Sequence, residues 1–506
     1  SRCDDAGRDA TPARHSSTSR ASRARDRMPR GPRASASGAV GRADAPYDAL
    51  NRVRESGEGV DEIHRRWRAA HASGDAPEIE FARGSEGLLP EYDVIVVGAG
   101  LSGCTIAERC SRALGMKVLT LERRAHAGGN CYDYVDARSG IRCSKYGAHL
   151  FHTKHARVWE YVTRFSEWVP FDHRVLGRVT RTSASEEGKR ARVLVPIPPT
   201  RATVNALFDD ADVRSDEDME AWYERERIHP EGGRAPANGE EAALSRVGPR
   251  LYEAIFKHYT KKQWDKYPEE LDASVLMRLP CRTSADDRYF NDPWQALPRR
   301  GYTRIFENML HGDENITVRL NCDYFAMKRD GTLPKHKFLV YTGQIDSYYA
   351  ALGMPKLEYR SLRFEEEYVE GVKDEDADDA DADDDSGLFF QEAMVVNYPG
   401  PDVPFTRIVE YKHMPNQPEG RHREPGTLVA REYSSATGEP YYPVPNPENR
   451  ALYEKYAELA KHEPGVAFVG RLASYKYFNM DEAVLNALEM FDNLRDTGAL
   501  VVKEKS

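Results

Sequence analysis

The stretch YDVIVVGAGLSGCTIAERCSRALGMKVLTLERR, Tyr92–Arg124, contains the pattern that decides the fold. Its first part, Val94–Val97, is an unbroken apolar run, which is typical of a parallel strand buried on both faces. Gly98, Gly100 and Gly103 follow as a GxGxxG turn. Glycines at this spacing permit a tight turn, a close approach of the backbone to a pyrophosphate and close packing of the helix on the strand. The stretch therefore predicts a Rossmann-like domain that binds a dinucleotide.

An acidic residue and a second glycine pair narrow the choice of dinucleotide. Glu122 ends the next apolar strand, at the separation from the turn where a carboxylate accepts hydrogen bonds from a ribose. Gly128, Gly129 and Asn130 follow directly. This pattern resembles FAD-binding proteins more than simple NAD dehydrogenases, so FAD is the predicted dinucleotide.

Composition excludes several classes of protein. A chain of 506 residues has room for two or three domains. Its formal net charge of −10 argues against a general nucleic-acid binder, because phosphates are repelled at long range. An anionic substrate would then be held by a few local arginines. No run reaches the roughly 18 apolar residues needed to span a bilayer. Seven scattered cysteines without a CxxC pair favour buried thiols in a reducing, cytoplasmic compartment.

Two segments are predicted to lie outside the folded body. Residues 1–88 are rich in Arg, Ser, Gly and Asp, so they are interpreted as a disordered extension. Within it, Ser16–Arg33 resembles an organelle transit peptide, although nearby aspartates conflict with targeting, and a plain flexible tail is the alternative. The spacing over Asn51–His71 predicts a weak amphipathic helix that docks on the main body. The acidic run Asp374–Asp385 must stay solvated, which predicts a surface insertion.

Apolar spacing predicts further local structure. Strands ending near Val179 and beginning at Val193 flank a polar stretch, which indicates a hairpin with a long loop. Helical spacing runs through Ala242–Trp264 and again through Glu448–Lys461.

The stretch KYGAHLFHT, Lys145–Thr153, places His149 and His152 three residues apart. Such a pair supplies half of a metal site, but no third ligand cluster is evident in the sequence, so no metal is predicted.

Ten short motifs follow one another along the chain: GGN (Gly128–Asn130), KYGAHLFHT (Lys145–Thr153), HYTKKQW (His258–Trp264), RLPCR (Arg278–Arg282), DDRYFND (Asp286–Asp292), YTGQID (Tyr341–Asp346), LEYRSL (Leu357–Leu362), PFTRIVEYKH (Pro404–His413), EPYYPV (Glu439–Val444) and GRLASYKYFNMDEA (Gly470–Ala483). In this order they resemble the bacterial type of the UDP-galactopyranose mutase family. The resemblance spans roughly Tyr92 to Leu494 and leaves out the extension and the acidic insertion.

The resemblance implies an isomerase that interconverts UDP-galactopyranose and UDP-galactofuranose. In this family reduced FAD is required, and its N5 attacks the anomeric carbon while UDP leaves. NAD(P)H or another reductant would activate the flavin. The implied partner is the UDP-galactose substrate. Neither a nucleic acid nor a membrane span is expected, and a homodimer is a further hypothesis.

The resemblance also implies a set of site residues. Arg278, Arg407 and His152 are expected to be catalytic, the two arginines by binding the pyrophosphate; a structural histidine is the alternative for His152. The expected FAD contacts are Gly98, Gly100, Ser102, Gly103, Glu122, Arg123, Gly129, Asn130, His149, Leu150, Tyr324, Arg471, Asn479 and Met480. The expected substrate contacts are His173, Tyr259, Thr260, Trp264, Tyr289, Tyr441 and Tyr477; core packing is the alternative for Trp264.

Two residues depart from the family pattern. Many relatives have Asp at the position of Asn479, so an acid–base group is not obligatory there. Many have Gly at the position of Asp265, which leaves the local loop geometry open.

The expected fold class is α/β: a Rossmann-like FAD-binding domain with an inserted helical domain and an antiparallel β-sheet domain. The expected order is an extension (1–88), the first FAD part (89–176), the first sheet part (177–200), the helical substrate domain (201–277), the second sheet part (278–300), the second FAD part (301–350), the sheet domain with its acidic insertion at 371–387 (351–440) and the C-terminal FAD part (441–506).

Two other functions share these patterns. A flavin oxidoreductase of the amine-oxidase type has the same glycine turn and GGN motif, but it has no need of arginines placed for a diphosphate. A non-catalytic protein that binds FAD and a nucleotide sugar also fits.

Overall fold

The structure is a computed structural model that describes residues 79–182, 190–277, 280–370 and 389–500. The amphipathic helix expected over Asn51–His71 and the acidic run Asp374–Asp385 lie outside the described residues. The predicted extension reached residue 88, but residues 79–88 contact the folded body. Gly84 donates its N–H to the Leu320 carbonyl at 3.0 Å, beside an isolated bridge between Arg83 and Leu320.

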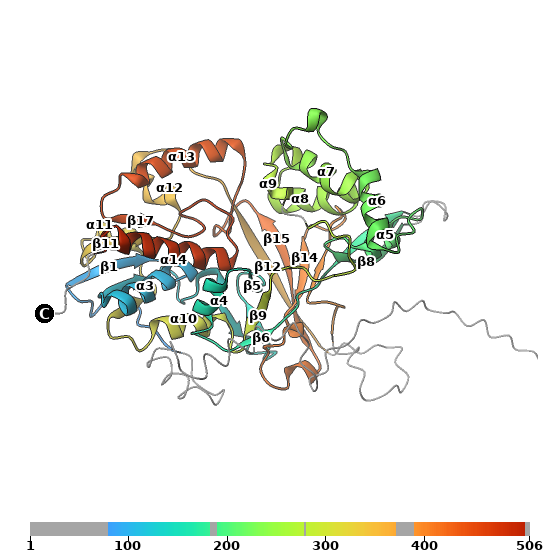
Figure 1. Ribbon diagram of the computed structural model, residues 1–506. Coiled ribbons are helices and arrows are strands. Elements are labelled where there is room, and N and C mark those ends of the chain that lie inside the picture. The colour runs from blue at the N-terminus through green and yellow to red at the C-terminus, as the bar shows by residue number, and fades with distance from the viewer. Residues whose placement is uncertain (1–78, 183–189, 278–279, 371–388, 501–506) are drawn as a thin grey trace, which may run out of the picture. The chain divides into compact units, whose positions relative to one another are not determined.

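A five-stranded parallel sheet forms the first layer (Figure 1). Its strand order is β10-β2-β1-β11-β17, and all four neighbouring pairs are parallel. The strands are β1 (Glu91–Val97), β2 (Val118–Leu121), β10 (Ile316–Arg319), β11 (Lys335–Tyr341) and β17 (Val466–Phe468). The chain thus enters this sheet from three separate segments.

Both faces of β1 are buried, as its apolar run predicts. Val94 and Val96 join the core cluster that includes α3 (Leu101–Leu114) and α14 (Met480–Asp496). Ile95 belongs to a second cluster with residues of α11 (Tyr324–Arg329). Successive side chains of a strand point to opposite faces, so helices cover both sides of the sheet.

A seven-stranded sheet forms the second layer, in the order β16-β12-β15-β14-β13-β7-β8. Neighbours are antiparallel except for the β13–β7 pair. The strands are β7 (Val175–Thr182), β8 (Arg190–Ile197), β12 (Tyr359–Val369), β13 (Val395–Asn397), β14 (Arg407–Glu410), β15 (Thr427–Ser435) and β16 (Tyr442–Pro443). The expected hairpin is confirmed, because Val179 pairs with Val193 across β7 and β8.

Smaller elements connect the two layers. They are the sheets β3–β4 (Asp133–Val135, Arg142–Ser144) and β5-β9-β6 (Phe151–Thr153, Trp294–Pro298, Trp168–Pro170), with α4 (Ala156–Val162), α10 (Tyr302–Leu310), α12 (Ile345–Tyr348) and α13 (Pro447–Lys461). A 3₁₀ helix, Gly129–Cys131, follows the second glycine pair. The helix predicted over Glu448–Lys461 is confirmed, because α13 spans Pro447–Lys461.

A helical unit is inserted between β8 and β9. It contains α5 (Arg201–Leu207), α6 (Asp216–Glu226), α7 (Gly239–Leu251), α8 (Lys257–Trp264) and α9 (Ser274–Met277). The helical spacing predicted one run over Ala242–Trp264. The structure breaks this run at Gly248, whose φ is 74°, before Pro249 and a π-helical turn.

The structure confirms the predicted α/β class, with one parallel sheet and one mainly antiparallel sheet. Five of the six described cysteines are buried and all six are free thiols, as predicted. In the described part of the chain, no helix has the length and apolar character that crossing a bilayer requires.

We expect Arg109→Met to lower the free energy of unfolding by about 3 kcal/mol, because it removes the two shortest bonds to a buried carboxylate and leaves it only Tyr161 and the more distant Arg112 among the described residues. Arg109 donates Nε and Nη2 to Glu108 at 2.5 Å each, and only 1% of the Glu108 side chain is exposed. Urea unfolding followed by tryptophan fluorescence measures the loss. Arg329→Met is the control, since Arg329 pairs with Asp330 at the exposed surface and should change the stability by under about 0.5 kcal/mol. Equal losses in the two variants would contradict the prediction.

Candidate functional site

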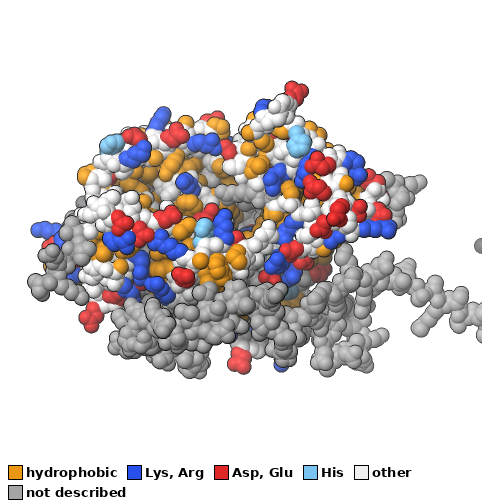
Figure 2. Space-filling view, viewed as in Figure 1, with side chains coloured by type: hydrophobic (Ala, Val, Ile, Leu, Met, Phe, Trp, Pro, Cys, Tyr) orange, Lys and Arg blue, Asp and Glu red, His pale blue; other side chains and the backbone are white. Residues whose placement is uncertain are grey.

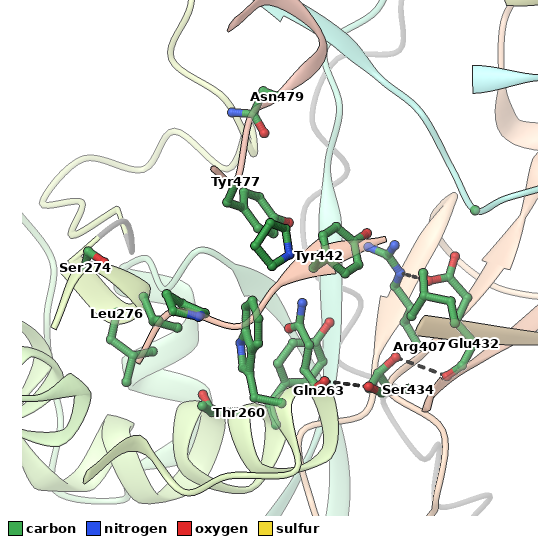
Figure 3. A pocket seen from close by; sticks show the side chains of 18 of the residues that line it. Thr260, Gln263, Ser274, Leu276, Arg407, Glu432, Ser434, Tyr442, Tyr477 and Asn479 are labelled. Carbon is green, nitrogen blue, oxygen red and sulfur yellow. Dashed lines mark hydrogen bonds and ion pairs between the residues drawn. The ribbon is translucent and has the colours of Figure 1, made fainter. Parts of the chain in front are cut away.

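A cavity of about 890 Å³ lies where the parallel-sheet part, the seven-stranded sheet and the helical unit meet. In Figure 2 the surface is hollowed between the helices on the two sides of the view. Figure 3 shows side chains from α8, β14, β15, β16 and the segment before α14 turned toward this space. Its size falls within the range of small-molecule and cofactor sites.

The glycine turn leaves no room for side chains. A Cβ on Gly103 would lie 1.9 Å from the Gly98 carbonyl oxygen, and a Cβ on Gly129 would lie 2.9 Å from the Gly100 Cα. Gly100 caps α3 without a side-chain hydrogen bond, and the first turn of α3 carries no acidic residue. The positive end of the helix is therefore left for an external anion, as a pyrophosphate cradle requires.

Glu122 is held against this turn. Its Oε2 accepts the Ala99 N–H at 2.9 Å and its Oε1 accepts the Arg124 N–H at 2.8 Å, and the residue is 7% exposed. Each oxygen keeps a second lone pair for a ribose hydroxyl. The observed glycine cradle, the uncapped helix and this carboxylate fit the adenosine diphosphate part of FAD.

Two of the predicted FAD contacts, Arg123 and Tyr324, lie away from the predicted site. Arg123 points outward, with 62% of its side chain exposed, and bonds Glu439 at 3.0 Å. Arg124 instead donates to the Asn130 Oδ1 at 3.0 Å. Tyr324 is buried at the start of α11 in the second core cluster and does not line the cavity.

The segment Gly147–Leu150 forms one wall of the cavity. Gly147 has a φ of +90°, and its carbonyl contacts the His149 Nδ1 at 2.8 Å. Burial lowers the pKa of His149 to about 4, so this histidine is neutral at pH 7. A neutral ring beside bare backbone provides a flat, uncharged surface for an isoalloxazine.

His152 also lines the cavity, and Asp292 and Phe290 hold its ring in place. Its Nδ1 lies 2.5 Å from the Asp292 Oδ2, and its ring stacks on Phe290 with centroids 3.7 Å apart. The hydrogen bond from His152 lowers the pKa of Asp292. No cluster of three His, Cys, Asp or Glu suited to a metal ion occurs among the described residues.

Arg407 is the positive charge at the centre of the cavity wall. Its Nε donates to the Glu432 Oε2 at 2.6 Å, and Glu432 is 1% exposed. Figure 3 shows Glu432 behind Arg407, on the side away from Tyr442. Glu432 takes Nε, and no bond from the Nη groups to another described residue is seen, so this fork is available to bind an anion. Arg278, the second predicted arginine, lies outside the described residues.

Aromatic and hydroxyl side chains surround this arginine. Tyr259, Thr260 and Trp264 line the cavity from α8. Tyr477 stacks on Tyr442 with centroids 5.1 Å apart, and both line the cavity.

Three predicted substrate residues behave differently from one another. Tyr289 lines the cavity and is 37% exposed. Tyr441 does not line it: the residue is 5% exposed, just before β16, and its ring centroid lies 6.2 Å from that of Tyr146. Tyr442, the first residue of β16, lines the cavity instead. His173 lines the cavity, is 3% exposed and has no partner for its Nδ1.

The C-terminal motif closes the far wall. Arg471 donates to the carbonyls of Tyr441 at 3.3 Å and Phe478 at 2.5 Å. Asn479 forms the capping box of α14, and Met480 begins that helix; both line the cavity. The Ser102 hydroxyl donates to the Ala483 carbonyl at 3.2 Å and ties α3 to α14.

Among the cavity residues that the sequence analysis missed are Gln263, Asn397, Glu432 and Tyr442. Asn397 lies directly opposite Arg407 in the β13–β14 pair, and its Oδ1 is buried without a partner. The signal for Asn397 is the polar residue that ends the apolar strand; the other three depend on strand pairing and helix packing that the sequence does not display.

Asp265, which departs from the family pattern, ends α8 in the left-handed conformation with a φ of 58°. Glycine adopts this conformation without strain, whereas Asp tolerates it at a small cost. The departure therefore leaves the turn after Trp264 in place.

Comparisons with known proteins agree along the chain. The UDP-galactopyranose mutase family profile matches residues 254–477, and an NAD(P)-binding Rossmann-like domain profile matches residues 96–165. A probable UDP-galactopyranose mutase of Klebsiella pneumoniae is 36% identical over 406 residues, covering 79% of this chain and 94% of that protein. A dTDP-fucopyranose mutase of Escherichia coli is 33% identical, covering 78% and 96%. A crystal structure of reduced UDP-galactopyranose mutase shares the fold, with a TM-score of 0.60 at 16% identity, covering 82% of this chain and 96% of that one.

We expect Gly103→Ala to yield protein with little bound flavin, because the new methyl group would meet the Gly98 carbonyl and push α3 away from the turn. The absorbance ratio of flavin to protein after purification measures this. Gly331→Ala is the control: its φ is +69°, but a Cβ there meets nothing within 4 Å. Full flavin content in Gly103→Ala would contradict the assignment of the cradle.

We expect His173 to make stability fall as the pH drops below about 6.5, the usual pKa of histidine. Burial lowers its pKa to about 3 in the folded protein, so only the unfolded chain takes up this proton between these values. The free energy of unfolding should fall by about 1.4 kcal/mol per pH unit from this residue. Urea titrations at pH 6.5 and 5 measure the slope, and His173→Phe should flatten it by that amount. An unchanged slope in the variant would contradict the prediction.

Proposed function

The chain belongs to the UDP-galactopyranose mutase family, and on that premise we propose that it is a flavin-dependent isomerase of a nucleotide sugar, interconverting UDP-galactopyranose and UDP-galactofuranose. The observation that carries the proposal is Arg407, held by a buried carboxylate in a cavity whose other wall suits a flavin ring. An oxidoreductase of the amine-oxidase type has no use for a guanidinium placed in this way.

The described residues fit FAD at two places. The glycine cradle with Glu122 suits its diphosphate and ribose, and Gly147–Leu150 with the start of α14 suits its ring. When bound and reduced, the flavin supplies the nucleophile for the anomeric carbon. Everything else in the reaction has to come from the protein or the substrate.

Arg407 has the clearest part in the reaction. A nucleotide diphosphate that leaves carbon gains negative charge, and a preorganised guanidinium stabilises that charge most where water is excluded. Glu432 holds the guanidinium by Nε and so fixes the direction of the Nη groups. The amide of Asn397, opposite Arg407, supplies a further polar contact on the same wall. Arg278 stays the predicted second arginine.

The aromatic residues orient the substrate. Tyr259, Tyr442 and Tyr477 present hydroxyl groups on rigid rings that lose little conformational entropy when they bind. We assign Thr260 and Trp264 on α8 to the uridine side. His149 stays neutral beside the flavin face, so it adds no charge that would compete with the arginine.

A closely related substrate is the second candidate. The Escherichia coli relative is named a dTDP-fucopyranose mutase, and its identity to this chain, 33%, is close to the 36% of the Klebsiella protein. Ring contraction of dTDP-fucopyranose would use the same diphosphate and flavin contacts, so both substrates belong in the assay.

Four further proposals accompany the activity. They are that the reduced form of FAD is active, that NAD(P)H or another reductant supplies the electrons, that the protein forms a homodimer and that it works in the cytoplasm. Free, buried thiols support a reducing compartment.

One assay tests the activity. The purified protein is reduced with dithionite under nitrogen, given UDP-galactofuranose or dTDP-fucofuranose, and the products are separated by chromatography. Isomerisation to the pyranose supports the mutase. Reoxidised flavin with an altered sugar would show an oxidoreductase, and binding without any product would show a catalytically silent protein.

We expect Arg407→Met to lower kcat/KM by roughly 30- to 4,000-fold, which corresponds to about 2–5 kcal/mol of lost transition-state stabilisation. Arg407→Lys should recover only part of this, because an ammonium cannot replace a planar fork. The control is Arg363→Met on β12, where the arginine is 56% exposed and pairs with Glu365. Near-normal turnover in Arg407→Met would refute the assignment.

A further inference from the structure

Lys262 on α8 is held by three backbone carbonyls of the connection between β13 and β14. Its Nζ donates to the carbonyls of Tyr398, of Phe405 at 2.9 Å and of Val403 at 3.3 Å. An ammonium has three donors, so this set of carbonyls satisfies all of them. Lys262 is not among the residues that line the cavity.

The place of these carbonyls along the chain matters. Tyr398 directly follows Asn397, the last residue of β13, and Phe405 precedes Arg407, the first residue of β14, by two positions. Asn397 and Arg407 are register partners that both line the cavity. The Lys262 ammonium therefore joins the two sides of the turn just beyond this pair.

A second contact fixes the same helix to the same sheet. The carbonyl of Gln263 accepts the Ser434 hydroxyl at 2.5 Å and the Arg360 Nε at 3.3 Å. Ser434 lies on β15 and Arg360 on β12, so the end of α8 is bonded to two further strands. Figure 3 shows Gln263 and Ser434 joined below Arg407.

These contacts set the spacing between two groups of predicted substrate residues. Tyr259, Thr260 and Trp264 line the cavity from α8, whereas Arg407 lines it from β14. A nucleoside diphosphate has a fixed length, so a ligand that spans both groups binds tightly only when their separation is correct. A misplacement of about 1 Å can cost 100-fold in rate.

We propose that Lys262 is a positioning residue for the nucleoside diphosphate: it sets α8 against the β13–β14 turn and thereby fixes the distance between the uridine-side residues and Arg407. This inference rests on the proposed function. Lys262 acts through the turn and the helix and does not touch the substrate.

The test compares Lys262→Met, Lys262→Arg and, as matched control, Lys261→Met. Lys261 directly precedes Lys262 on α8. Its Nζ donates to the carbonyl of Asp265 at 2.7 Å, at the end of the same helix. Three quantities are measured on the flavin-loaded protein: the Kd of UDP by calorimetry, the split between kcat and KM, and hydrogen exchange of peptides covering residues 398–406.

We expect Lys262→Met to weaken UDP binding by about tenfold or more, equivalent to about 1.4 kcal/mol, and to speed hydrogen exchange across residues 398–406. KM should rise more than kcat falls, and flavin content should stay unchanged. The Kd of UDP for Lys262→Arg should stay within about threefold of the wild-type value. The Kd for Lys261→Met should equal the wild-type value.

Two outcomes would overturn the proposal: UDP affinity in Lys262→Met equal to the wild type, or an equal loss in Lys261→Met, which would indicate general charge attraction. If Lys262→Met loses its flavin, Lys262→Gln takes its place with the same thresholds. Failure of the wild type to isomerise either furanose would refute the proposed function alone, because hydrogen exchange and UDP affinity still decide the role of Lys262.

Discussion

The contact between α3 and the glycine turn governs the rest of the structure. A side chain at Gly103 would occupy the space of the Gly98 carbonyl, so the helix can start against the strand only because Gly103 has none. Once α3 is placed, its Ser102 hydroxyl receives α14 through the Ala483 carbonyl. α14 then brings the C-terminal motif to the cavity, where Asn479 and Met480 line the same space as the segment Gly147–Leu150. One steric constraint thus links residues that are almost 400 positions apart.

The cavity combines the buried ion pair of Arg407 and Glu432 with two neutral histidines, His149 and His173. Glu432 is almost fully buried, and it is stable there as a carboxylate because Arg407 lies 2.6 Å away. His149 and His173 contribute no charge at pH 7, since burial lowers their pKa values to about 4 and about 3. A diphosphate entering this space meets the positive fork of Arg407, and neither His149 nor His173 adds a charge there. Burying charged groups away from water costs free energy of folding. The same exclusion of water strengthens the electrostatic attraction between Arg407 and a charged ligand.

Local patterns could be predicted from the sequence, and long-range pairing could not. The glycine turn, Glu122 and the hairpin around Val179 depend on neighbours in the chain, and the structure agrees with each. The choice between Tyr441 and Tyr442 depends on how the short strand β16 pairs with Arg360 of β12, some eighty residues away. The break at Gly248 had a signal in the sequence, the dipeptide Gly248–Pro249, but the apolar spacing that continues on both sides favoured one unbroken helix. Residues 79–88 carry no strong pattern, and their backbone bonds to Leu320 explain why they nonetheless join the fold.

The discontinuity of the parallel sheet has a consequence for biosynthesis. The last strand, β17, and the helix that completes the cofactor wall, α14, are encoded close to the C-terminal end of the described chain. A nascent polypeptide still inside the ribosome at Met480 has its glycine cradle but lacks the wall opposite Gly147–Leu150. That wall of the site is therefore completed only once α14 has been synthesised, and until β17 is added β11 is an unpaired edge of the sheet, the kind of edge that chaperones protect.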